Sequence, residues 1–393
     1  MIELVQVNNM SKVSLLRVDN YNIENLELKI KEAISLIGSI DELIKKDSKV
    51  FIKLNCVGPF GKDTGITTHP AFVEAVIRIV LDKTKNIIIG DNPATKDITS
   101  VLKKNGVYEV VQKYNLKIID GKDSVKITNP NPHIYSEFEV SREYIECDTL
   151  INLPKLKTHT LTYMTCAEKN FFGLIFGLQK AGWHVKASNP LEFGQALNDL
   201  YGALLNSFKE KTILNICDGI LGLDGDGPST GGFAVMCNAI LASTDAISLD
   251  TIACRLVKLN EEKIFVTNIG AERGYGENKN IEIIGDSLDK FVDVKFEGPK
   301  STLSSFGLRL LKKKFFRNLL LEHPKINKNI CLKCGECAKI CPPKTMVIKP
   351  KEFPHLKTNQ CIRCWCCAEV CPANAIVKSH RPLIGKIVFS IKL

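Results

Sequence analysis

The sequence predicts an α/β protein with a mostly parallel or mixed sheet covered by helices, followed by a small cysteine-rich α+β domain. Through residues 1–300, short apolar segments of strand length alternate with helical patterns. Such alternation is typical of a sheet with helices on both faces. Nine of the fifteen cysteines then fall within residues 331–371. A chain of 393 residues, 45 % of them hydrophobic, is long enough for one large core and one smaller one.

Strands are expected where short apolar runs lack clean polar alternation, as in a sheet buried on both faces. These runs are residues 48–55, 85–91, 116–120, 148–154, 212–218, 238–244 and 281–286. Helices are expected over residues 69–83 and 245–259, where apolar residues recur at helical spacing. Pro70 suits the first turn of the former. The order of these elements predicts one α/β domain over residues 1–300.

A change of composition marks the end of this domain. Residues 296–307 are rich in Gly, Pro and Ser, which is typical of a boundary. We therefore expect a basic connecting helix or linker over 301–329, a cysteine-rich domain over 330–380 and a tail over 381–393. Leu308, Leu311, Phe315 and Leu319 form one helical stripe in residues 308–321. This stripe predicts a helix packed on the main domain, with peripheral membrane contact or partner binding as the alternative.

The charge distribution is uneven along the chain. Residues 301–393 contain 18 basic and 4 acidic residues, whereas residues 1–300 carry a net charge of −4. The first residues lack the pattern of a signal peptide, and the longest apolar run, 171–178, is too short for a transmembrane segment. The sequence therefore predicts a cytoplasmic protein with reduced thiols. Interleaved aromatic residues and a known reader motif are missing from the basic region, which argues against nucleic-acid binding.

The cysteines form one pattern that occurs twice, thirty residues apart. "CLKCGECAKICP" at 331–342 aligns with "CIRCWCCAEVCP" at 361–372. Each is the CxxCxxCxxxCP run that binds [4Fe–4S] clusters in bacterial ferredoxins, where the fourth cysteine binds the other cluster. The sequence thus predicts a ferredoxin-like domain with two [4Fe–4S] clusters. One would be held by Cys331, Cys334, Cys337 and Cys371, and the other by Cys361, Cys364, Cys367 and Cys341.

Other uses of these cysteines fit the pattern less well. A zinc site needs four ligands, not eight in duplicated runs, and a disulfide framework does not suit a cytoplasmic protein. Cys366 aligns with Glu336 and has no counterpart in the other repeat, so we expect a packed or solvent-edge thiol. Lys333, Lys339 and Lys344 lie close to the ligands. Such a basic rim can guide an acidic electron-carrier protein to the clusters or can simply solvate a small module.

A second group of candidate residues follows the predicted strand 148–154. Lys155, Lys157 and His159 come at its carboxyl end, the edge at which α/β sheets bind ligands. Three potential cations in five residues suit a carboxylate or a phosphate, although a solvated basic loop is the simpler interpretation. The histidines His69, His159 and His184 are candidates for proton transfer, because histidine titrates near neutral pH.

Two further loops are expected to leave strand ends. Residues 55–70 and 217–232 are rich in glycine, but neither matches a nucleotide-binding motif. Asp224 and Asp226 lack a bidentate Glu at EF-hand spacing, which argues against calcium. Each loop taken alone is more typical of a plain connection than of a cofactor site.

Several of these segments resemble one known family. The order "VFIKLNCVG", "GITTHPAFVEAVIRIVL", "IIIGDNP", "LPKLKTHTLT", "EKNFFGLIFG" and "DGILGLDGDGPSTGG" is similar to the domain-of-unknown-function family 362, whose members are often fused to a two-cluster ferredoxin. The resemblance implies one shared site assembled from TTHP, PKLKTH and KN..G. Leu54 departs from the family's usual IKPN. The TTHP and KTH segments are also similar in style to the nickel-pincer lactate racemase domain, but that cofactor is not carried over.

Three functions remain open from the sequence. The first is an iron–sulfur oxidoreductase that passes electrons through two [4Fe–4S] clusters to or from a small anionic substrate held by Lys155, Lys157 and His159. The second is a redox accessory protein, either an electron carrier or a maturation factor. The third is a non-redox ligand-binding domain with sensory or structural clusters. Reduced clusters near a surface are damaged by oxygen, so an anaerobic host would suit the protein.

Overall fold

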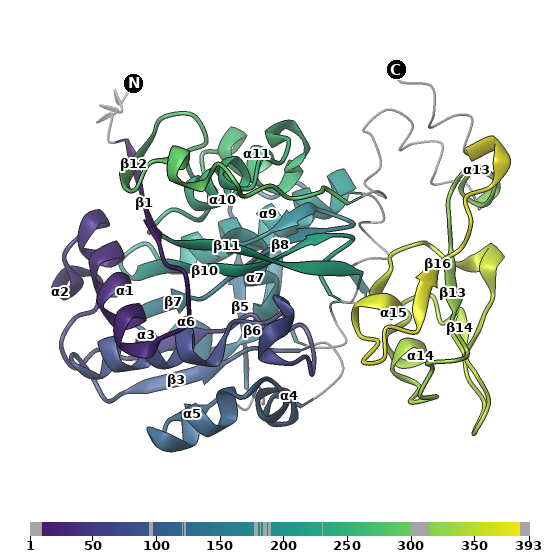
Figure 1. Cartoon of the computed structure of the whole chain (residues 1–393), viewed down its shortest axis with the longest axis horizontal. Helices are drawn as coiled ribbons and strands as arrows, with labels where there is room; N and C mark the ends of the chain where they lie inside the picture. Colours follow the sequence, from purple (N-terminus) through teal and green to yellow (C-terminus); the bar gives the residue numbers. More distant parts are fainter. Residues whose placement is uncertain are drawn as a thin grey trace.

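The computed structural model describes residues 10–93, 97–119, 121, 123–176, 180, 182–183, 187, 190–229, 231–299 and 314–385. Its main domain is built on a mixed α/β sheet, and the cysteine-rich domain lies beside one end of that sheet (Figure 1). The order of the strands across the sheet is β12 (Ile281–Gly285), β1 (Ser11–Arg17), β11 (Gly232–Ser243), β10 (Thr212–Gly225), β7 (Thr149–Asn152), β2 (Val50–Lys53), β3 (Ile87–Gly90) and β4 (Lys117–Ile118). The four pairings from β10 through β7, β2 and β3 to β4 are parallel.

The strands are apolar because both faces of the sheet are buried. Along β2, Val50 and Ile52 join the core on one face, whereas Phe51 joins the core on the other. The first face is covered mainly by α1 (Ile23–Ile37), α3 (Pro70–Leu81), α4 (Ile98–Asn105) and α5 (Val107–Lys113), with the short α2 (Ile40–Leu43) beside them. The second face packs against α6 (Arg142–Glu146), α7 (Ala167–Asn170), α9 (Pro190–Ser207), α10 (Ala246–Leu256), α11 (Phe265–Glu272) and the hairpin of β5 (Ser124–Thr128) and β6 (Glu137–Ser141). The predicted α/β fold class is therefore confirmed.

The seven strands expected from the sequence are present, but two of them are longer than expected. β10 continues to Gly225 and pairs antiparallel with β11, which begins at Gly232. Most of the glycine-rich segment 217–232 is thus part of this hairpin, so the expectation of a loop there is wrong. Glycine is needed inside β10 because a Cβ on Gly222 would press against Phe296 and Cys237. The sequence analysis also did not name β1 as a strand.

The cysteine-rich domain has a duplicated backbone. α14 (Glu336–Ile340) and α15 (Cys366–Glu369) lie thirty residues apart, as do β14 (Met346–Val347) and β16 (Ile376–Lys378). β14 pairs with β15 (His355–Leu356), and β16 pairs with β13 (Pro324–Ile326). Positive φ angles also recur at this interval: Gly335 at 80° corresponds to Trp365 at 63°, and Lys344 and Asn374 are both at 53°. The repeat read from the cysteines therefore extends to the conformation of the loops between them.

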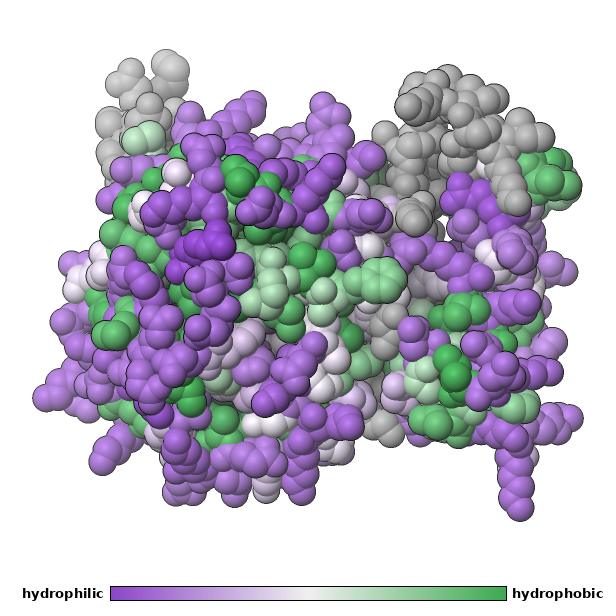
Figure 2. Space-filling view, in the orientation of Figure 1, coloured by the Kyte–Doolittle hydropathy of each residue, from purple (hydrophilic) through white to green (hydrophobic). Residues whose placement is uncertain are grey.

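The connecting helix is described only in its second half. α13 (Lys314–Leu320) packs against the short helix Thr358–Gln360 of the cysteine-rich domain, and Phe315 is 70 % exposed. The expectation that this stripe packs on the main domain is therefore not met by α13, whereas residues 308–313 lie outside the described residues. Membrane contact by this segment stays a prediction. Within the described parts of the chain, no helix has both the length and the apolarity needed to cross a bilayer. Hydrophilic residues cover much of the outer rim of both domains (Figure 2).

Candidate functional site

The candidate residues of the main domain lie on a strand that continues beyond β7. After Pro154 the chain resumes as β8 (Lys155–His159), which runs parallel to β10 and pairs antiparallel with β9 (Tyr163–Thr165). Alternate residues of a strand share one face and stand about 6.6 Å apart. Lys155, Lys157 and His159 therefore point to the same side but reach three successive places, each with its own partners.

Lys155 is part of a buried polar cluster. Its ammonium group donates to Asp218 Oδ2 at 2.6 Å and to the hydroxyl of Tyr21 at 2.9 Å, and both charged side chains are fully buried. His69 caps α3 through Nδ1, which accepts from the backbone N–H of Ala71, and its ring stacks on Tyr21 at 3.7 Å. Burial lowers the pKa of His69 to about 4. The structure thus places these two predicted site residues, Lys155 and His69, in a neutralised cluster that holds β8 and β10 to α3.

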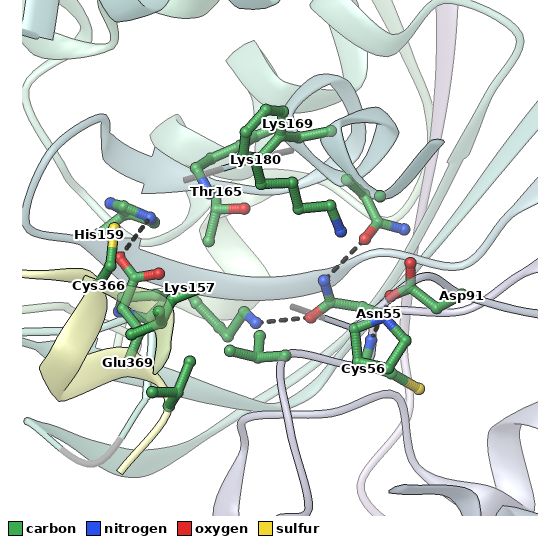
Figure 3. A pocket seen from close by; sticks show the side chains of 18 residues that line it. Asn55, Cys56, Asp91, Lys157, His159, Thr165, Lys169, Lys180, Cys366 and Glu369 are labelled. Carbon is green, nitrogen blue, oxygen red and sulfur yellow. Dashed lines mark hydrogen bonds and ion pairs between the residues drawn. The ribbon is translucent and has the colours of Figure 1, made fainter. Parts of the chain in front are cut away.

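Lys157 and His159 instead line a cavity between the two domains (Figure 3). One wall comes from the main domain and the other from α14 and α15. The polar residues of its lining are Asn55, Cys56, Asp91, Lys157, His159, Thr165, Lys169, Asn170, Lys180, Cys366 and Glu369. The parallel strands β2 and β3 end at this place, as the general rule for ligand sites in α/β sheets predicts. His184, the remaining histidine of the prediction, lies outside the described residues.

Lys157 is almost completely buried at the base of the cavity, with 1 % exposure. Its ammonium group donates to Asn55 Oδ1 at 2.5 Å and to the carbonyl of Ile66 at 2.8 Å. Burial, together with the neighbouring charges of Lys169 and Lys155, lowers the pKa of Lys157 to about 7. The two hydrogen bonds fix the position of this group, while the low pKa allows it to gain or lose a proton near neutral pH.

Two further lysines extend into the same cavity. Lys180 donates to the carbonyl of Asn92, and burial lowers its pKa to about 8. Burial also lowers the pKa of Lys169. Among the described residues, no side-chain or backbone acceptor and no carboxylate pairs with the ammonium group of Lys169, which lies 6.0 Å from the ring centre of Phe172. A cation that the protein itself leaves without an acceptor is suited to an anionic ligand.

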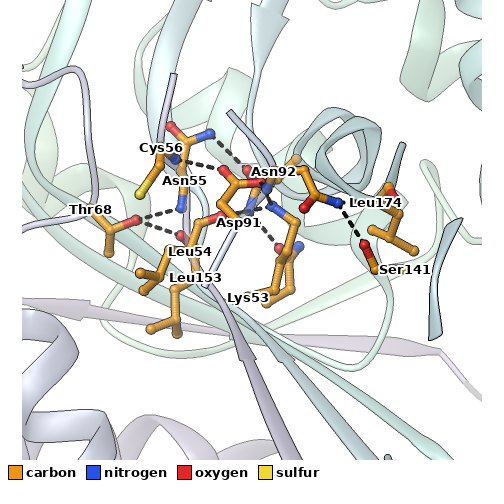
Figure 4. A network of polar contacts seen from close by, with 12 residues as sticks. Lys53, Leu54, Asn55, Cys56, Thr68, Asp91, Asn92, Ser141, Leu153 and Leu174 are labelled. Carbon is orange, nitrogen blue, oxygen red and sulfur yellow. Dashed lines mark hydrogen bonds and ion pairs between the residues drawn. The ribbon is translucent and has the colours of Figure 1, made fainter. Parts of the chain in front are cut away.

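The floor of the cavity is held by a buried network of amides and one ion pair (Figure 4). Lys53 donates to Asp91 Oδ1 at 2.7 Å, and the other oxygen of Asp91 accepts from the backbone N–H of Cys56. Asn170 accepts from Asn55 and donates to Asn152 and Leu54. A Cβ on Gly173 would collide with both Lys53 and Asp91. The glycine of the KN..G motif is therefore required by the close approach of this ion pair.

The opposite wall belongs to the cysteine-rich domain. Glu369 Oε1 of α15 lies 3.7 Å from His159 Nε2, and Lys378 forms a 2.6 Å ion pair with Asp226 of the main domain. Nδ1 of His159 accepts from the backbone N–H of Leu161, so the proton of a neutral ring sits on Nε2 and faces Glu369. Cys366 is 4 % exposed and packs with Ile340 and Val370 beside Cys364. This expected packed thiol thus lies in the cavity wall.

Each predicted set of four cysteines surrounds its own small cavity in the C-terminal domain. One cavity is lined by Cys331, Cys334, Cys337 and Cys371. The other is lined by Cys341, Cys361, Cys364 and Cys367. Each thus combines three cysteines of one repeat with the last cysteine of the other.

Backbone amides point at two of these sulfur atoms. Thr345 and Met346 donate to Cys341 Sγ at 3.3 and 3.4 Å, and Ala375 donates to Cys371 Sγ at 3.2 Å. Such N–H donors stabilise a thiolate and are the outer-shell contacts that tune iron–sulfur centres. In the described part of the chain, no three His, Cys, Asp or Glu side chains are gathered close enough to ligate a single metal ion. The four cysteines of each set instead line a cavity.

Several residues of the interdomain cavity are not among the candidates that the sequence offers. Asp91 is the last residue of the predicted strand 85–91 and directly follows β3, so its place at a strand end is readable from the pattern. Lys180 lies beyond the quoted motifs, and the sequence alone gives no sign of its role. Glu369 sits inside the cysteine run and reaches the cavity only because the two domains meet there. A signal for such a contact between domains is not present in local sequence.

The chain is similar to several known proteins. The thylakoid-associated protein sll1697 of Synechocystis sp. is 26 % identical over 316 residues, which cover 76 % of this chain and 96 % of that protein. The lactate racemase apoprotein of Thermoanaerobacterium thermosaccharolyticum superposes with a TM-score of 0.41 at 14 % identity, over 64 % of this chain and 57 % of that one. A structural-genomics protein from Thermotoga maritima gives 0.39 at 12 %, over 62 % and 61 %. The family model described as "Domain of unknown function (DUF362)" matches residues 50–255, and the chain therefore belongs to that family.

Proposed function

We propose that the protein is an iron–sulfur oxidoreductase that exchanges electrons with a small anionic substrate bound between its two domains. The observation that carries this proposal is the composition of the interdomain cavity. Lys157, Lys169, Lys180 and His159 line it from one side, whereas Cys366 and Glu369 of the cysteine run line it from the other. A ligand bound to the lysines would therefore lie against the helix that carries Cys367.

Two [4Fe–4S] clusters are the redox groups that the cysteine-rich domain would hold. The two four-cysteine cavities support this assignment, because a cubane cluster needs one thiolate at each of four corners. The amide donors to Cys341 and Cys371 support it as well. When bound, such clusters supply single electrons. Cys364 packs against Ile340, Cys366 and Val370, which belong to the cavity wall. The cluster that Cys364 would help to hold would therefore be the one nearer to the substrate.

The residues of the main domain have separable tasks in this proposal. Lys169 and Lys180 attract and orient the anion. Lys157, fixed by Asn55 and Ile66, holds a proton that can be transferred near neutral pH. His159 presents its Nε2 proton beside Glu369 and can serve as a second donor. The place of the cavity between two domains removes part of the surrounding water, which strengthens each of these charge interactions.

Replacing Lys169 with alanine should weaken binding of a small dicarboxylate about tenfold to a hundredfold, the effect of losing one hydrogen bond to a charged group. Calorimetric titration with succinate measures this directly. Lys126→Ala is the matched control, because Lys126 is 73 % exposed on β5, far from the cavity lining. Equal affinity in both variants would argue against an anion site at Lys169.

Anion binding should also weaken as the pH rises from 6 to 9. The pKa values of Lys157 and Lys180 are lowered to about 7 and about 8, so the cavity loses positive charge across this range, while Asp91 and Glu369 face the same space. In Lys157→Met the step near pH 7 should disappear. Through the same titration, the free energy of unfolding of the wild type should rise as the pH increases from 7 to 10.5. In this range the unfolded chain still holds a proton that folded Lys157 has released, and this advantage of the unfolded chain shrinks as the pH increases. A pH-independent affinity would contradict this account.

Anaerobic purification tests the redox part of the proposal. We expect roughly eight irons and eight sulfides per chain, a paramagnetic signal on reduction, and a change of that signal when a small carboxylate binds. An electron carrier without its own substrate would give the same iron content but no response to any carboxylate. Cavity variants would then still reduce an artificial acceptor at the wild-type rate.

A further inference from the structure

Two cysteines outside the duplicated run lie together behind the interdomain cavity. Cys166 Sγ and Cys217 Sγ are 3.3 Å apart, and the two residues are 1 % and 0 % exposed. A disulfide bond has a sulfur separation of about 2.05 Å, so a small movement of either side chain would join them. Cys166 follows Thr165 and precedes α7, and both Thr165 and the α7 residue Lys169 line the cavity.

A pair of buried carboxyl groups accompanies these thiols. Asp250 of α10 accepts from the backbone N–H groups of Ala167 at 2.6 Å and Glu168 at 3.1 Å, the two residues that directly follow Cys166. Burial raises the pKa of Asp250 to about 7. Both carboxyl oxygens of Glu168 lack a hydrogen-bond partner within the described residues, although this residue is only 2 % exposed. Buried polar groups without partners are rare and point to a role beyond packing.

The other buried cysteines of the main domain differ from this pair. Cys147 donates to the carbonyl of Tyr144, and Cys254 to that of Leu259. Each behaves as a small core side chain with one backbone partner. Within the described part of the main domain, Cys166 and Cys217 are the thiols whose hydrogen-bond partner is another sulfur.

We propose that Cys166 and Cys217 form a dithiol–disulfide couple that holds two electrons beside the substrate cavity. The groups that would give electrons to this couple, or take them from it, are those of the proposed function, on which this inference rests. On oxidation two S–H bonds break, one S–S bond forms, and two protons and two electrons leave. Asp250 would take up one proton and pass it on before the second arrives, so that both protons end on solvent, and the two proposed [4Fe–4S] clusters would take up one electron each. On reduction every step reverses. The couple would thus match two single-electron centres to a substrate reaction that needs an electron pair.

Thiol mapping at controlled potential tests this couple without an activity assay. Anaerobically purified protein is poised with dithionite or with the dithiol oxidant diamide, quenched and unfolded in acid, alkylated and digested. We expect the Cys166 and Cys217 peptides to be alkylated after reduction and to be recovered as one cross-linked peptide after oxidation. Renewed reduction should restore both alkylated peptides. The Cys147 and Cys254 peptides should be alkylated under both conditions.

Variants separate the couple from general oxidation. In Cys217→Ser, Cys166 should be alkylated after either treatment, whereas Cys254→Ser should leave the cross-link unchanged. Wild-type protein with its full iron content but without a Cys166–Cys217 cross-link would overturn the couple and leave the proposed function standing. A reversible cross-link in a protein that binds no iron would keep the couple and overturn the proposed function.

Discussion

Replacing Cys371 with alanine should remove about half of the iron from the anaerobically purified protein, from roughly eight to roughly four atoms per chain. Cys371 lies in the second repeat but lines the cavity of the first, with Cys331, Cys334 and Cys337. Loss of one of four thiolates opens a corner of a single cluster. Iron and sulfide analysis with paramagnetic resonance measures the result. Cys366→Ala is the matched control, because this neighbouring cysteine lines neither four-cysteine cavity and should retain all iron.

Double variants identify which ligands share a cluster. If Cys331 and Cys371 bind the same cluster, Cys331→Ala/Cys371→Ala should keep roughly four irons, no fewer than either single variant. Cys361→Ala/Cys371→Ala should lose nearly all of the iron, because one ligand is removed from each cluster. The reverse pattern would mean that each repeat holds its own cluster and that the crossed assignment is wrong.

Replacing Asp218 with alanine should lower the free energy of unfolding by roughly 3–5 kcal/mol, the usual cost of leaving a buried charge without its partner. Asp218 accepts from Lys155, from the hydroxyl of Tyr21 and from the backbone N–H of His69. All these donors lose their acceptor in the variant. Urea unfolding of the protein at constant iron content measures the change.

Two controls show whether the unpaired charge causes this loss. Lys155→Met/Asp218→Leu removes both charges and should recover much of the stability, because apolar side chains can replace a buried ion pair at little cost. Glu137→Ala removes the partner of Lys126 in an exposed pair at 3.4 Å and should change the free energy of unfolding by at most about 1 kcal/mol. A Lys155→Met/Asp218→Leu variant no more stable than Asp218→Ala would contradict this explanation.

The sequence predicts the sheet and the cysteine repeat well because both depend on local patterns. Apolar runs without alternation identify β2, β3 and β7, and Pro70 identifies the first turn of α3. The hairpin of β10 and β11 is hidden by its glycines, which indicate a loop when read alone. In the structure they serve close packing, as Gly222 does beside Phe296. Pairing with a distant strand decides their conformation, and local propensity does not report it.

The candidate site is predictable only in part, for a related reason. Lys155, Lys157 and His159 share a face of the buried strand β8, whereas the sequence places them only at the end of the preceding strand and makes a solvated loop the simpler interpretation. Their partners come from distant segments: Asp218 for Lys155, and Glu369 for His159. Spacing therefore identifies a row of cations but not which member is neutralised in the interior and which borders the cavity. Only the packing of β10 and of the cysteine-rich domain separates them.

The wall that α14 and α15 provide has a consequence for damage by oxygen. These helices carry Cys337 and Cys367 and also close the cavity through Ile340, Cys366 and Glu369. If the cysteine-rich domain holds the two proposed clusters, their destruction would remove the order of that wall, and the lysines of the cavity would become open to water. The damaged protein would then no longer bind its ligand. Oxygen would therefore inactivate the protein before the damaged form could convert its substrate.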